Sequence, residues 1–399
     1  MDRSLDLKKA PVSRGTRADL ARDILICSLD QPLRFRSLVQ HQVLRNRSLS
    51  SKKRQALSAL LYACLRFRKS IWPQKQIPTK IDLEELENYI NSCQQKSLQE
   101  IRKSTQDDFE KLSCELSYPS WMLSQWTLDH GVDRALDMAF WMNREAKIFL
   151  RSNTIKTTTE TLLQYFQKHG IEASQSSEIE TSIKILGRIN LRALPAFKKG
   201  WFEIQDEGSQ KIVALSGAKP RTMVIDGCAR TGGKSLALAM YMKDQGQILA
   251  LDVDARVFDE LKKRAKRAGI KSVQPFWIAP DDPNPMPQYF QKADLVLVDA
   301  PCSGSGTISR RPWTKWSIEE EDLSRFHDMQ LQILLRQSRW VRKEGTLIYS
   351  TCSLFSIENQ KVIEKFRDLH PEFLIEAQEY FFPDERGHDG YFFCKMKHQ

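Results

Sequence analysis

Residues 223–235 read MVIDGCARTGGKS, an apolar run that leads into a glycine-containing loop and then into a helical pattern. The same alternation of strand and helix continues to the C-terminus. Strands are predicted at 223–226, 248–252, 272–277, 295–299, 346–350 and 391–394, with helices at 234–243 and 257–268. Alternating strands and helices favour a largely parallel sheet with helices on both faces. The predicted fold class is therefore α/β.

The chain before this region is predicted to be mainly helical. Apolar residues recur at helical spacing over 17–70, and Ser50 is placed to cap the second helix of that stretch. Ser120 is expected to cap a further helix that opens at Trp121. From about residue 147 a strand, a helix and short strand-like pieces indicate a small α+β unit. The predicted domains are an all-helical domain at 1–115, a helical linker with the α+β domain at 116–205, and the α/β domain at 206–399.

The positive charge is concentrated at one end of the chain. The net charge is +11, and residues 1–105 hold 21 Lys and Arg against 10 Asp and Glu, whereas the remainder is balanced at 40 and 40. A concentrated basic module indicates a polyanionic partner, most often nucleic acid. The alternative interpretation is a solvated basic surface that has no partner.

Several classes of protein are disfavoured. No run of 18 apolar residues occurs, so no membrane span is expected. Residues 1–6 lack the apolar core of a signal peptide, and a cytoplasmic location with reduced thiols is the expectation. The eight cysteines include no CxxC pair, so no metal site is expected.

The glycine loop admits two ligands. A nucleoside triphosphate requires GxxxxGK[ST]; Gly233-Lys234-Ser235 fits its end, but Cys228 stands at the required first glycine. The second candidate is S-adenosylmethionine. Asp252 ends the next predicted strand, where a carboxylate can accept hydrogen bonds from both ribose hydroxyls. A carboxylate there has no task in a P-loop enzyme, yet an RNA-dependent NTPase stays open as an alternative.

Two cysteines follow predicted strands. Cys302 lies in DAPCSG, just past the strand at 295–299, and Cys352 lies in YSTCS, just past the strand at 346–350. Parallel sheets bind ligands outside the carboxyl ends of their strands, so both thiols are expected at one site and indicate covalent chemistry. The alternative for either cysteine alone is a buried structural thiol.

Taken together, these motifs resemble the RNA cytosine-5 methyltransferases of the Sun/RsmB (Fmu) group. The matching segments are KGWFEIQDEGSQ (199–210), the glycine loop, DAPCSGSGTI (299–308), Lys315-Trp316, YSTCS (349–353), Glu358-Asn359 and HDGYFF (388–393). Residues 17–70 are similar to the NusB-like helical RNA-binding domain of the bacterial members. The resemblance implies a Rossmann-like class I methyltransferase domain preceded by a small RRM-like α+β domain and a NusB-like domain.

The resemblance also implies roles for particular residues. Cys352 is expected to attack the cytosine ring and Cys302 to assist release of the methylated product, while Asp299 and Lys234 contact the base. The expected cofactor is S-adenosylmethionine. The protein is expected to be a monomer, and its expected partner is RNA, in particular small-subunit (16S) ribosomal RNA. Residues expected to bind the cofactor are Cys228, Ala229, Gly232, Gly233, Lys234, Asp252, Asp281 (or Asp282) and Asp299. Residues expected to bind RNA are Lys52, Lys53, Arg54, Arg310 and Arg311.

One segment departs from the family's pattern. The family's loop usually reads CAAPGGKT, and here Arg230-Thr231 replaces the Ala-Pro pair. Arg230 adds bulk and charge beside the expected cofactor, and loss of the proline removes a fixed φ angle. This departure motivates a third interpretation, a non-catalytic RNA-binding or ribosome assembly factor.

Overall fold

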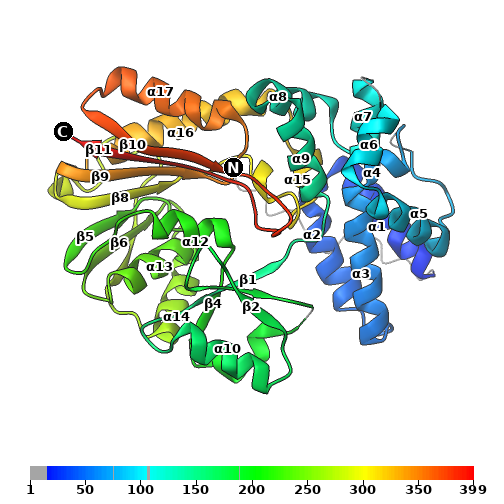
Figure 1. The fold of residues 1–399 in the computed structure, drawn as a ribbon, viewed down its shortest axis with the longest axis horizontal. Helices are drawn as coiled ribbons and strands as arrows, with labels where there is room; N and C mark the ends of the chain where they lie inside the picture. The colour runs from blue at the N-terminus through cyan, green and yellow to red at the C-terminus, as the bar shows by residue number, and fades with distance from the viewer. Residues whose placement is uncertain (1–15, 75, 106–107, 188) are drawn as a thin grey trace. The chain divides into compact units, whose positions relative to one another are not determined.

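The protein is described by a computed structural model that covers residues 16–399 apart from residues 75, 106, 107 and 188 (Figure 1). Residues 1–6, on which the signal-peptide expectation depends, lie outside this range. The chain forms two compact units. The helical unit consists of Met1–Arg144 with Ile308–Glu320, and the α/β unit consists of Glu145–Thr307 with Glu321–Gln399. The segment 308–320, although it belongs to the sequence of the predicted α/β domain, packs within the helical unit.

The helical unit confirms the helices predicted from apolar spacing. Its α-helices are α1 (Arg17–Asp30), α2 (Phe35–Leu38), α3 (Ser51–Arg66), α4 (Arg68–Ile71), α5 (Leu83–Gln95), α6 (Leu98–Thr105), α7 (Phe109–Leu116), α8 (Ser120–His130), α9 (Val132–Met142) and α15 (Thr314–Ser317). Ser50 caps α3 as predicted, because its hydroxyl accepts from the Lys53 N–H. The predicted cap at Ser120 is wrong: Pro119 takes the N-cap position, and the Ser120 hydroxyl donates to Glu110 instead.

The segment 308–320 is anchored in the helical unit by its aromatic and basic side chains. The Trp313 ring lies 6.3 Å from that of Phe35 and 6.1 Å from that of Tyr62. Lys315 is fully buried, and its ammonium donates to the carbonyls of Arg66 and Ser117, both at 3.0 Å, and to the Asn143 side chain. Burial holds the pKa of Lys315 well below its usual range. The motif pair Lys315-Trp316 therefore fixes this insertion to α3.

The α/β unit contains a small antiparallel sheet in the order β2-β3-β1-β4. Its strands are β1 (Ile148–Ser152), β2 (Ala173–Gln175), β3 (Ser182–Ile185) and β4 (Phe202–Ile204), accompanied by α10 (Thr159–Lys168) and α11 (Pro195–Lys198). Leu162 and Phe166 of α10 bury against Leu150 and Ile183 of the sheet. The predicted strand and helix of the α+β region are thus confirmed.

The main sheet has seven strands in the order β10-β11-β9-β8-β5-β6-β7. They are β5 (Thr222–Asp226), β6 (Gly246–Asp252), β7 (Val273–Trp277), β8 (Ala293–Asp299), β9 (Val341–Thr351), β10 (Phe373–Phe381) and β11 (Tyr391–His398). Strands β5 to β9 pair in parallel, and β11 joins antiparallel between β9 and β10. The α/β prediction is confirmed, although it missed β10 and the antiparallel edge.

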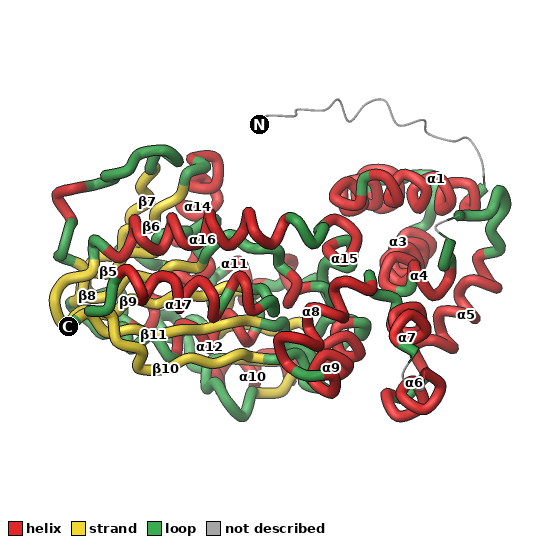
Figure 2. The backbone as a smooth tube through the Cα atoms, turned by 90° about the horizontal axis from the view of Figure 1, so that it is seen from above, coloured by secondary structure: helices red, strands yellow, loops and turns green. Residues whose placement is uncertain are grey.

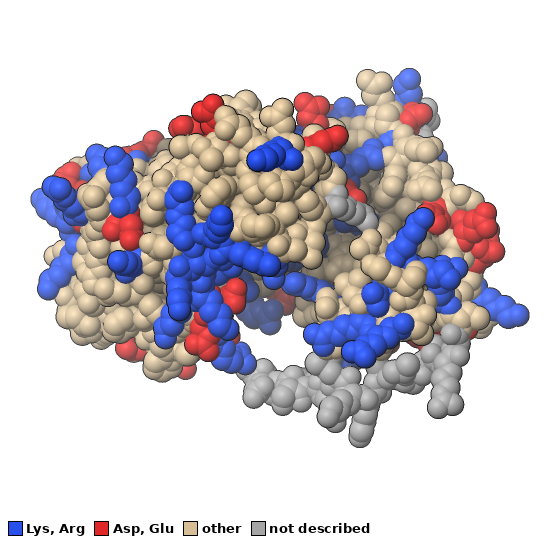
Figure 3. Space-filling model, turned by 90° about the horizontal axis from the view of Figure 1, so that it is seen from below, with Lys and Arg blue, Asp and Glu red and all other residues tan. Residues whose placement is uncertain are grey.

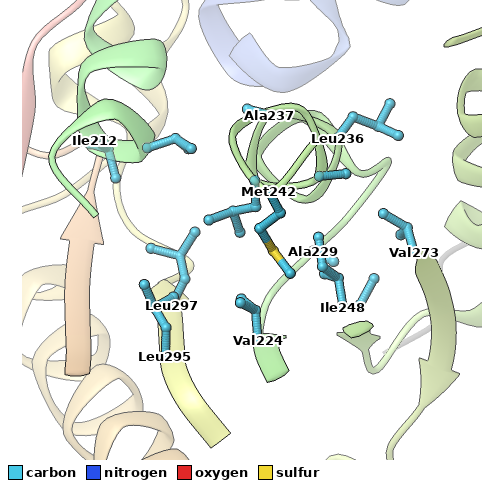
Figure 4. Packing of buried hydrophobic residues seen from close by; sticks show 14 of the residues in the cluster. Ile212, Val224, Ala229, Leu236, Ala237, Met242, Ile248, Val273, Leu295 and Leu297 are labelled. Atoms are coloured by element: carbon cyan, nitrogen blue, oxygen red, sulfur yellow. The ribbon is translucent and has the colours of Figure 1, made fainter. Parts of the chain in front are cut away.

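Helices cover both faces of this sheet, as predicted. One face carries α12 (Glu207–Ala214), α13 (Gly233–Tyr241) and α14 (Phe258–Ala268), and the other carries α16 (Asp322–Ser338) and α17 (Gln360–Leu369), as Figures 1 and 2 show. Side chains alternate along each strand, so Val224 packs beneath α13 while its neighbour Ile225 faces α16 and α17. Figure 4 shows the first of these layers, where Leu236 and Met242 of the α13 segment lie over the strands.

Among the described residues, no helix combines the length and apolar character needed to cross a membrane.

The buried ammonium of Lys315 gives a stability prediction. We expect Lys315→Met to lower the free energy of unfolding by about 3 kcal/mol, because three buried acceptors lose their donor. Urea unfolding of the full chain, followed by circular dichroism, measures the change. The exposed Lys111 on α7 provides the control, and Lys111→Met should leave stability within about 0.5 kcal/mol. Equal stabilities for the two variants would contradict the anchoring role of Lys315.

Candidate active site

The carboxyl ends of four parallel strands bring the predicted site residues to one edge of the main sheet. Asp226, Asp252 and Asp299 end β5, β6 and β8, and Cys352 follows the last residue of β9. The pairing register places Asp299 beside Ser350 of β9. This edge therefore collects residues that are up to 126 positions apart in the sequence.

The two cysteine side chains meet. The Sγ atoms of Cys302 and Cys352 lie 3.3 Å apart, and both residues are partly exposed. The hydrogen bond with Cys352, followed by burial, holds the pKa of Cys302 well above its ordinary value. The raised pKa favours the protonated form of Cys302, and either sulfur can be the donor of the contact.

A charged pair from two other elements lies at the same edge. The ammonium of Lys234, in the first turn of α13, donates to Asp299 Oδ2 at 2.7 Å, and the Ser350 hydroxyl donates to Asp299 Oδ1 at 3.0 Å. Lys234 is largely buried. Both carboxylate oxygens of Asp299 therefore have donors, which fixes its orientation. Sequence reasoning predicted Lys234 and Asp299 as site residues but not this contact between them.

A buried carboxylate links the two cysteine loops, and no role was predicted for it. Glu358 accepts from the Ser303 N–H at 2.8 Å and from the Gln330 side chain at 2.9 Å. It also accepts from the hydroxyls of Ser303 and Ser353, which follow Cys302 and Cys352 directly in the sequence. Burial raises the pKa of Glu358, although these donors oppose the rise. The spacing of the thiols depends on this carboxylate.

Two glycines lock the Cys302 loop to the C-terminal strand. The Gly306 N–H donates to the Cys352 carbonyl at 2.9 Å, and the Gly390 N–H donates to the Gly306 carbonyl at 2.8 Å. A Cβ on Gly306 would lie 2.2 Å from the Gly390 carbonyl oxygen, and a Cβ on Gly390 would lie 2.8 Å from a Leu354 methyl group and 3.1 Å from the Gly306 Cα. This approach explains why glycine occurs in both motifs.

The glycine loop is held in place without the proline of the family's pattern. Arg230 adopts a positive φ of 49°, and its N–H donates to Asp252 Oδ2 at 2.8 Å. Arg264 of α14 donates to the carbonyl and the hydroxyl of Thr231, at 2.8 and 3.0 Å. A Cβ at Gly227 would meet the Gln337 side chain at 1.6 Å. Side chains from α14 and α16 therefore take over the restraint that a proline would supply.

The loop also presents unused polar groups. Gly232 is the N-cap of α13, and no side chain caps this helix, so its first N–H groups are available to an anionic group. Asp226, which the sequence analysis did not single out, accepts from the Ser235 hydroxyl through Oδ2, while its buried Oδ1 has no hydrogen-bond partner among the described residues. The strand-end position of Asp226 directly before Gly227 was the available signal.

The other predicted residues belong to the glycine loop, to the loop after β7 and to the helical unit. Asp281 is exposed in the loop after β7, and Asp282 accepts from the Asn284 N–H. Burial raises the pKa of Cys228 to about 12, and its backbone neighbour Ala229 donates to the Leu251 carbonyl. The residues predicted to bind RNA all belong to the helical unit: Lys52, Lys53 and Arg54 in the first turn of α3, and Arg310 and Arg311 in the inserted segment.

Asp226 yields a prediction on pH. Burial raises its pKa from 3.8 to about 6, so the folded state binds a proton more tightly than the unfolded state. The stability that the protonated Asp226 carboxyl contributes to the folded state is fully present below about pH 4, and it is lost as the pH rises through 6. We expect Asp226→Asn to be about 2 kcal/mol more stable than wild type at pH 8, with the gain vanishing near pH 4.

Urea unfolding at several pH values measures this difference. Asp368→Asn, at an exposed position on α17, serves as the control and should show no such trend. A gain from Asp226→Asn that is constant with pH would contradict the assigned titration.

Family models match much of the chain. Residues 213–397 match the family described as 16S rRNA methyltransferase RsmB/F, and residues 118–192 match the ferredoxin-like domain described as Methyltr_RsmF/B-like. Both matches fall on elements described above: the first begins in α12 and runs through the main sheet, and the second begins just before α8 and runs through β1 to β3.

Individual relatives agree with these matches. The probable ribosomal RNA small subunit methyltransferase B of Bacillus subtilis (strain 168) is 28% identical, over 95% of this chain and 98% of its own. Ribosomal RNA small subunit methyltransferase B of Photorhabdus laumondii is 29% identical over 64% of this chain and 60% of its own.

Solved structures share the fold. The crystal structure of PH0851 aligns over 97% of this chain and 99% of its own, with a TM-score of 0.76 and 25% identity. NSun6 from Pyrococcus horikoshii, solved with SFG, aligns over 70% of this chain and 98% of its own, with a TM-score of 0.64 and 18% identity. The two domain matches and these relatives show that the chain belongs to the RsmB/F family of methyltransferases.

Proposed function

We propose that this protein transfers a methyl group from S-adenosylmethionine to carbon 5 of a cytosine in small-subunit ribosomal RNA, through a covalent bond between Cys352 and the base. The observation that carries the proposal is the pair of thiols, 3.3 Å apart, at the sheet edge that also holds Lys234 and Asp299. Relatives named as small-subunit ribosomal RNA methyltransferases support the choice of RNA.

The chemistry requires two sulfur atoms with different protonation states. Carbon 5 of cytosine is a poor nucleophile, and bonding of the Cys352 thiolate to carbon 6 moves electron density onto carbon 5. Cys302 retains its proton, which fits a partner that stays a thiol while Cys352 attacks. After methylation a base removes the proton from carbon 5, and Cys302 or a water beside it is the candidate. The electron pair of that C–H bond re-forms the ring double bond, and the bond from carbon 6 to Cys352 breaks with its electron pair returning to the sulfur.

The Lys234–Asp299 pair is suited to hold the base. Asp299 is a carboxylate with fixed orientation and can accept from the exocyclic amine or a protonated ring nitrogen of cytosine. Lys234 compensates its charge at 2.7 Å in a largely buried setting. An extruded base is needed for this contact, so a cytosine in single-stranded or loop RNA is the expected substrate.

The residues present fit S-adenosylmethionine, which supplies an electrophilic methyl group when bound. The uncapped N-terminus of α13, with Gly232 and Gly233, suits the carboxylate of its amino acid part. The free Oδ1 of Asp226 is an acceptor for an amino group. Asp252, at the end of β6, is positioned for the ribose, although it already accepts from Arg230 and Asp254.

Neither alternative function gains support from the geometry. A P-loop enzyme needs its lysine free to contact phosphates, whereas Lys234 is paired with Asp299. A non-catalytic factor was motivated by Arg230-Thr231, yet this loop is anchored by Asp252 and Arg264. No second function is therefore proposed.

Single cysteine variants test the proposal. With labelled S-adenosylmethionine and unmodified small-subunit ribosomal RNA, we expect Cys352→Ala to form no product, because no bond to carbon 6 forms. Cys302→Ala should accumulate a protein–RNA adduct that survives denaturation, since release of the product is impaired. Cys93→Ala, in the helical unit, is the matched control and should retain wild-type activity.

Full activity of Cys352→Ala would refute the assigned nucleophile. Binding of ATP in place of S-adenosylmethionine would refute the methyltransferase itself.

A further inference from the structure

Exposed lysines gather on one surface of the α/β unit, outside the site described above. Figure 3 shows Lys and Arg side chains clustered over the region where Figure 1 places α14. The lysines that form this surface, called here the α14 surface, are Lys198, Lys199, Lys262, Lys263, Lys266 and Lys271. All six are exposed, and they come from α11, α14 and the turns that follow each of these helices.

The backbone beneath the α14 surface is tightly joined. The Asn153 side chain donates to the carbonyls of Gly200 and Ala268, both at 2.8 Å. The Lys156 ammonium donates to the carbonyls of Lys199 and Arg267, at 3.0 and 2.7 Å. These bonds fix the turn after α11 against the last turn of α14, so lysines from two separate segments form one continuous and rigid surface.

One buried acidic group beside this surface is already neutralised. Glu203 is buried and pairs with both Arg264 and Arg267 of α14. Asp259 and Glu260 lie in the first turn of α14, close to Lys262 and Lys263 along the helix and at the opposite end from Lys266. The carboxylate of Asp244 accepts from the Lys271 N–H. None of the six lysines forms an ion pair with any residue that the structure describes. Their positive charge is therefore available to an external anion.

The chemistry of the α14 surface favours a nucleic acid backbone over a protein. Protein interfaces are centred on buried apolar anchors, and no exposed large apolar side chain lies on α11 or α14. Lysine ammonium groups are mobile point charges that contact phosphates without reading base sequence. A row of such charges along one helix and a neighbouring turn matches the regularly spaced phosphates of an RNA strand.

We propose that the α14 surface binds the sugar-phosphate backbone of the RNA substrate, as a second contact area in addition to the basic helical unit. This inference rests on the proposed function for the identity of the RNA. The surface contributes affinity through its charge, and it contributes no selectivity for sequence. Its removal should weaken RNA binding without altering the chemical step.

A triple substitution isolates this contribution. Lys262→Gln, Lys263→Gln and Lys266→Gln remove three charges from α14 and leave polar side chains that are one atom shorter than lysine. The matched control removes three exposed lysines from other elements: Lys343→Gln on β9, and Lys361→Gln and Lys365→Gln on α17. Both triple variants change the net charge equally, so a difference between them reports the location of the charge.

Fluorescence anisotropy with a single-stranded fragment of small-subunit ribosomal RNA, over about 50 to 200 mM salt, measures binding. For the α14 triple variant we expect about tenfold weaker binding at low salt and a salt slope smaller by about 2, because three phosphate contacts are lost. The KM for RNA should rise about tenfold with kcat unchanged. The control variant should match wild type.

Two outcomes would overturn the inference. One is equal affinity and equal salt slope for the α14 variant and its control, which would also be the result if the surface served an acidic protein. The other is a loss of kcat at saturating RNA. A third result separates the two proposals. If the wild-type protein transfers no methyl group but the α14 variant still binds RNA more weakly, the proposed reaction is refuted and the α14 surface remains an RNA-binding surface.

Discussion

The buried carboxylate of Glu358 is the interaction on which the site depends. Parallel strands bring the Cys302 and Cys352 loops to the same edge of the sheet, but a shared edge alone does not bring two sulfur atoms to 3.3 Å. Glu358 does so by accepting from both Ser303 and Ser353. An unpaired buried carboxylate costs several kcal/mol, so folding forms the carboxylate contact and the thiol pair together.

The neighbouring elements complete this arrangement. The close approach of Gly306 and Gly390 ties the Cys302 loop to β11, and the Lys234–Asp299 pair ties α13 to β8. The site is thus enclosed by contacts from both antiparallel and parallel parts of the sheet. In the proposed mechanism, preorganisation of this kind lets the Cys352 thiolate and the Asp299 carboxylate act without rearrangement.

Sequence reasoning predicted the parts of the fold that follow from local pattern. The strand ends at Asp252 and Asp299 and the capped helix at Ser50 were found because apolar periodicity and capping residues are local signals. Strand β10 was missed, because its seven residues from Leu374 to Tyr380 are largely exposed and lack the apolar pattern of a buried strand.

Long-range contacts lay beyond those signals. Three contacts of this kind join residues that are far apart in the sequence. Lys315 donates to the Arg66 carbonyl, Ser303 donates to Glu358, and Arg264 donates to the Thr231 carbonyl of the glycine loop. The balanced charge of residues 106–399 also concealed the α14 surface, because most of the acidic residues in that range lie outside residues 198–271. Composition averages over positions, whereas a binding surface depends on which charges share a face.

The most direct measurement is the pH dependence of Cys302 alkylation by iodoacetamide, resolved by peptide mass spectrometry, in wild type and in Cys352→Ala. The hydrogen bond with Cys352 is the largest cause of the raised pKa of Cys302. The account therefore predicts that removal of the Cys352 thiol moves the midpoint of Cys302 alkylation to lower pH. An unchanged profile would show that the two thiols do not share a proton and would contradict their division of roles.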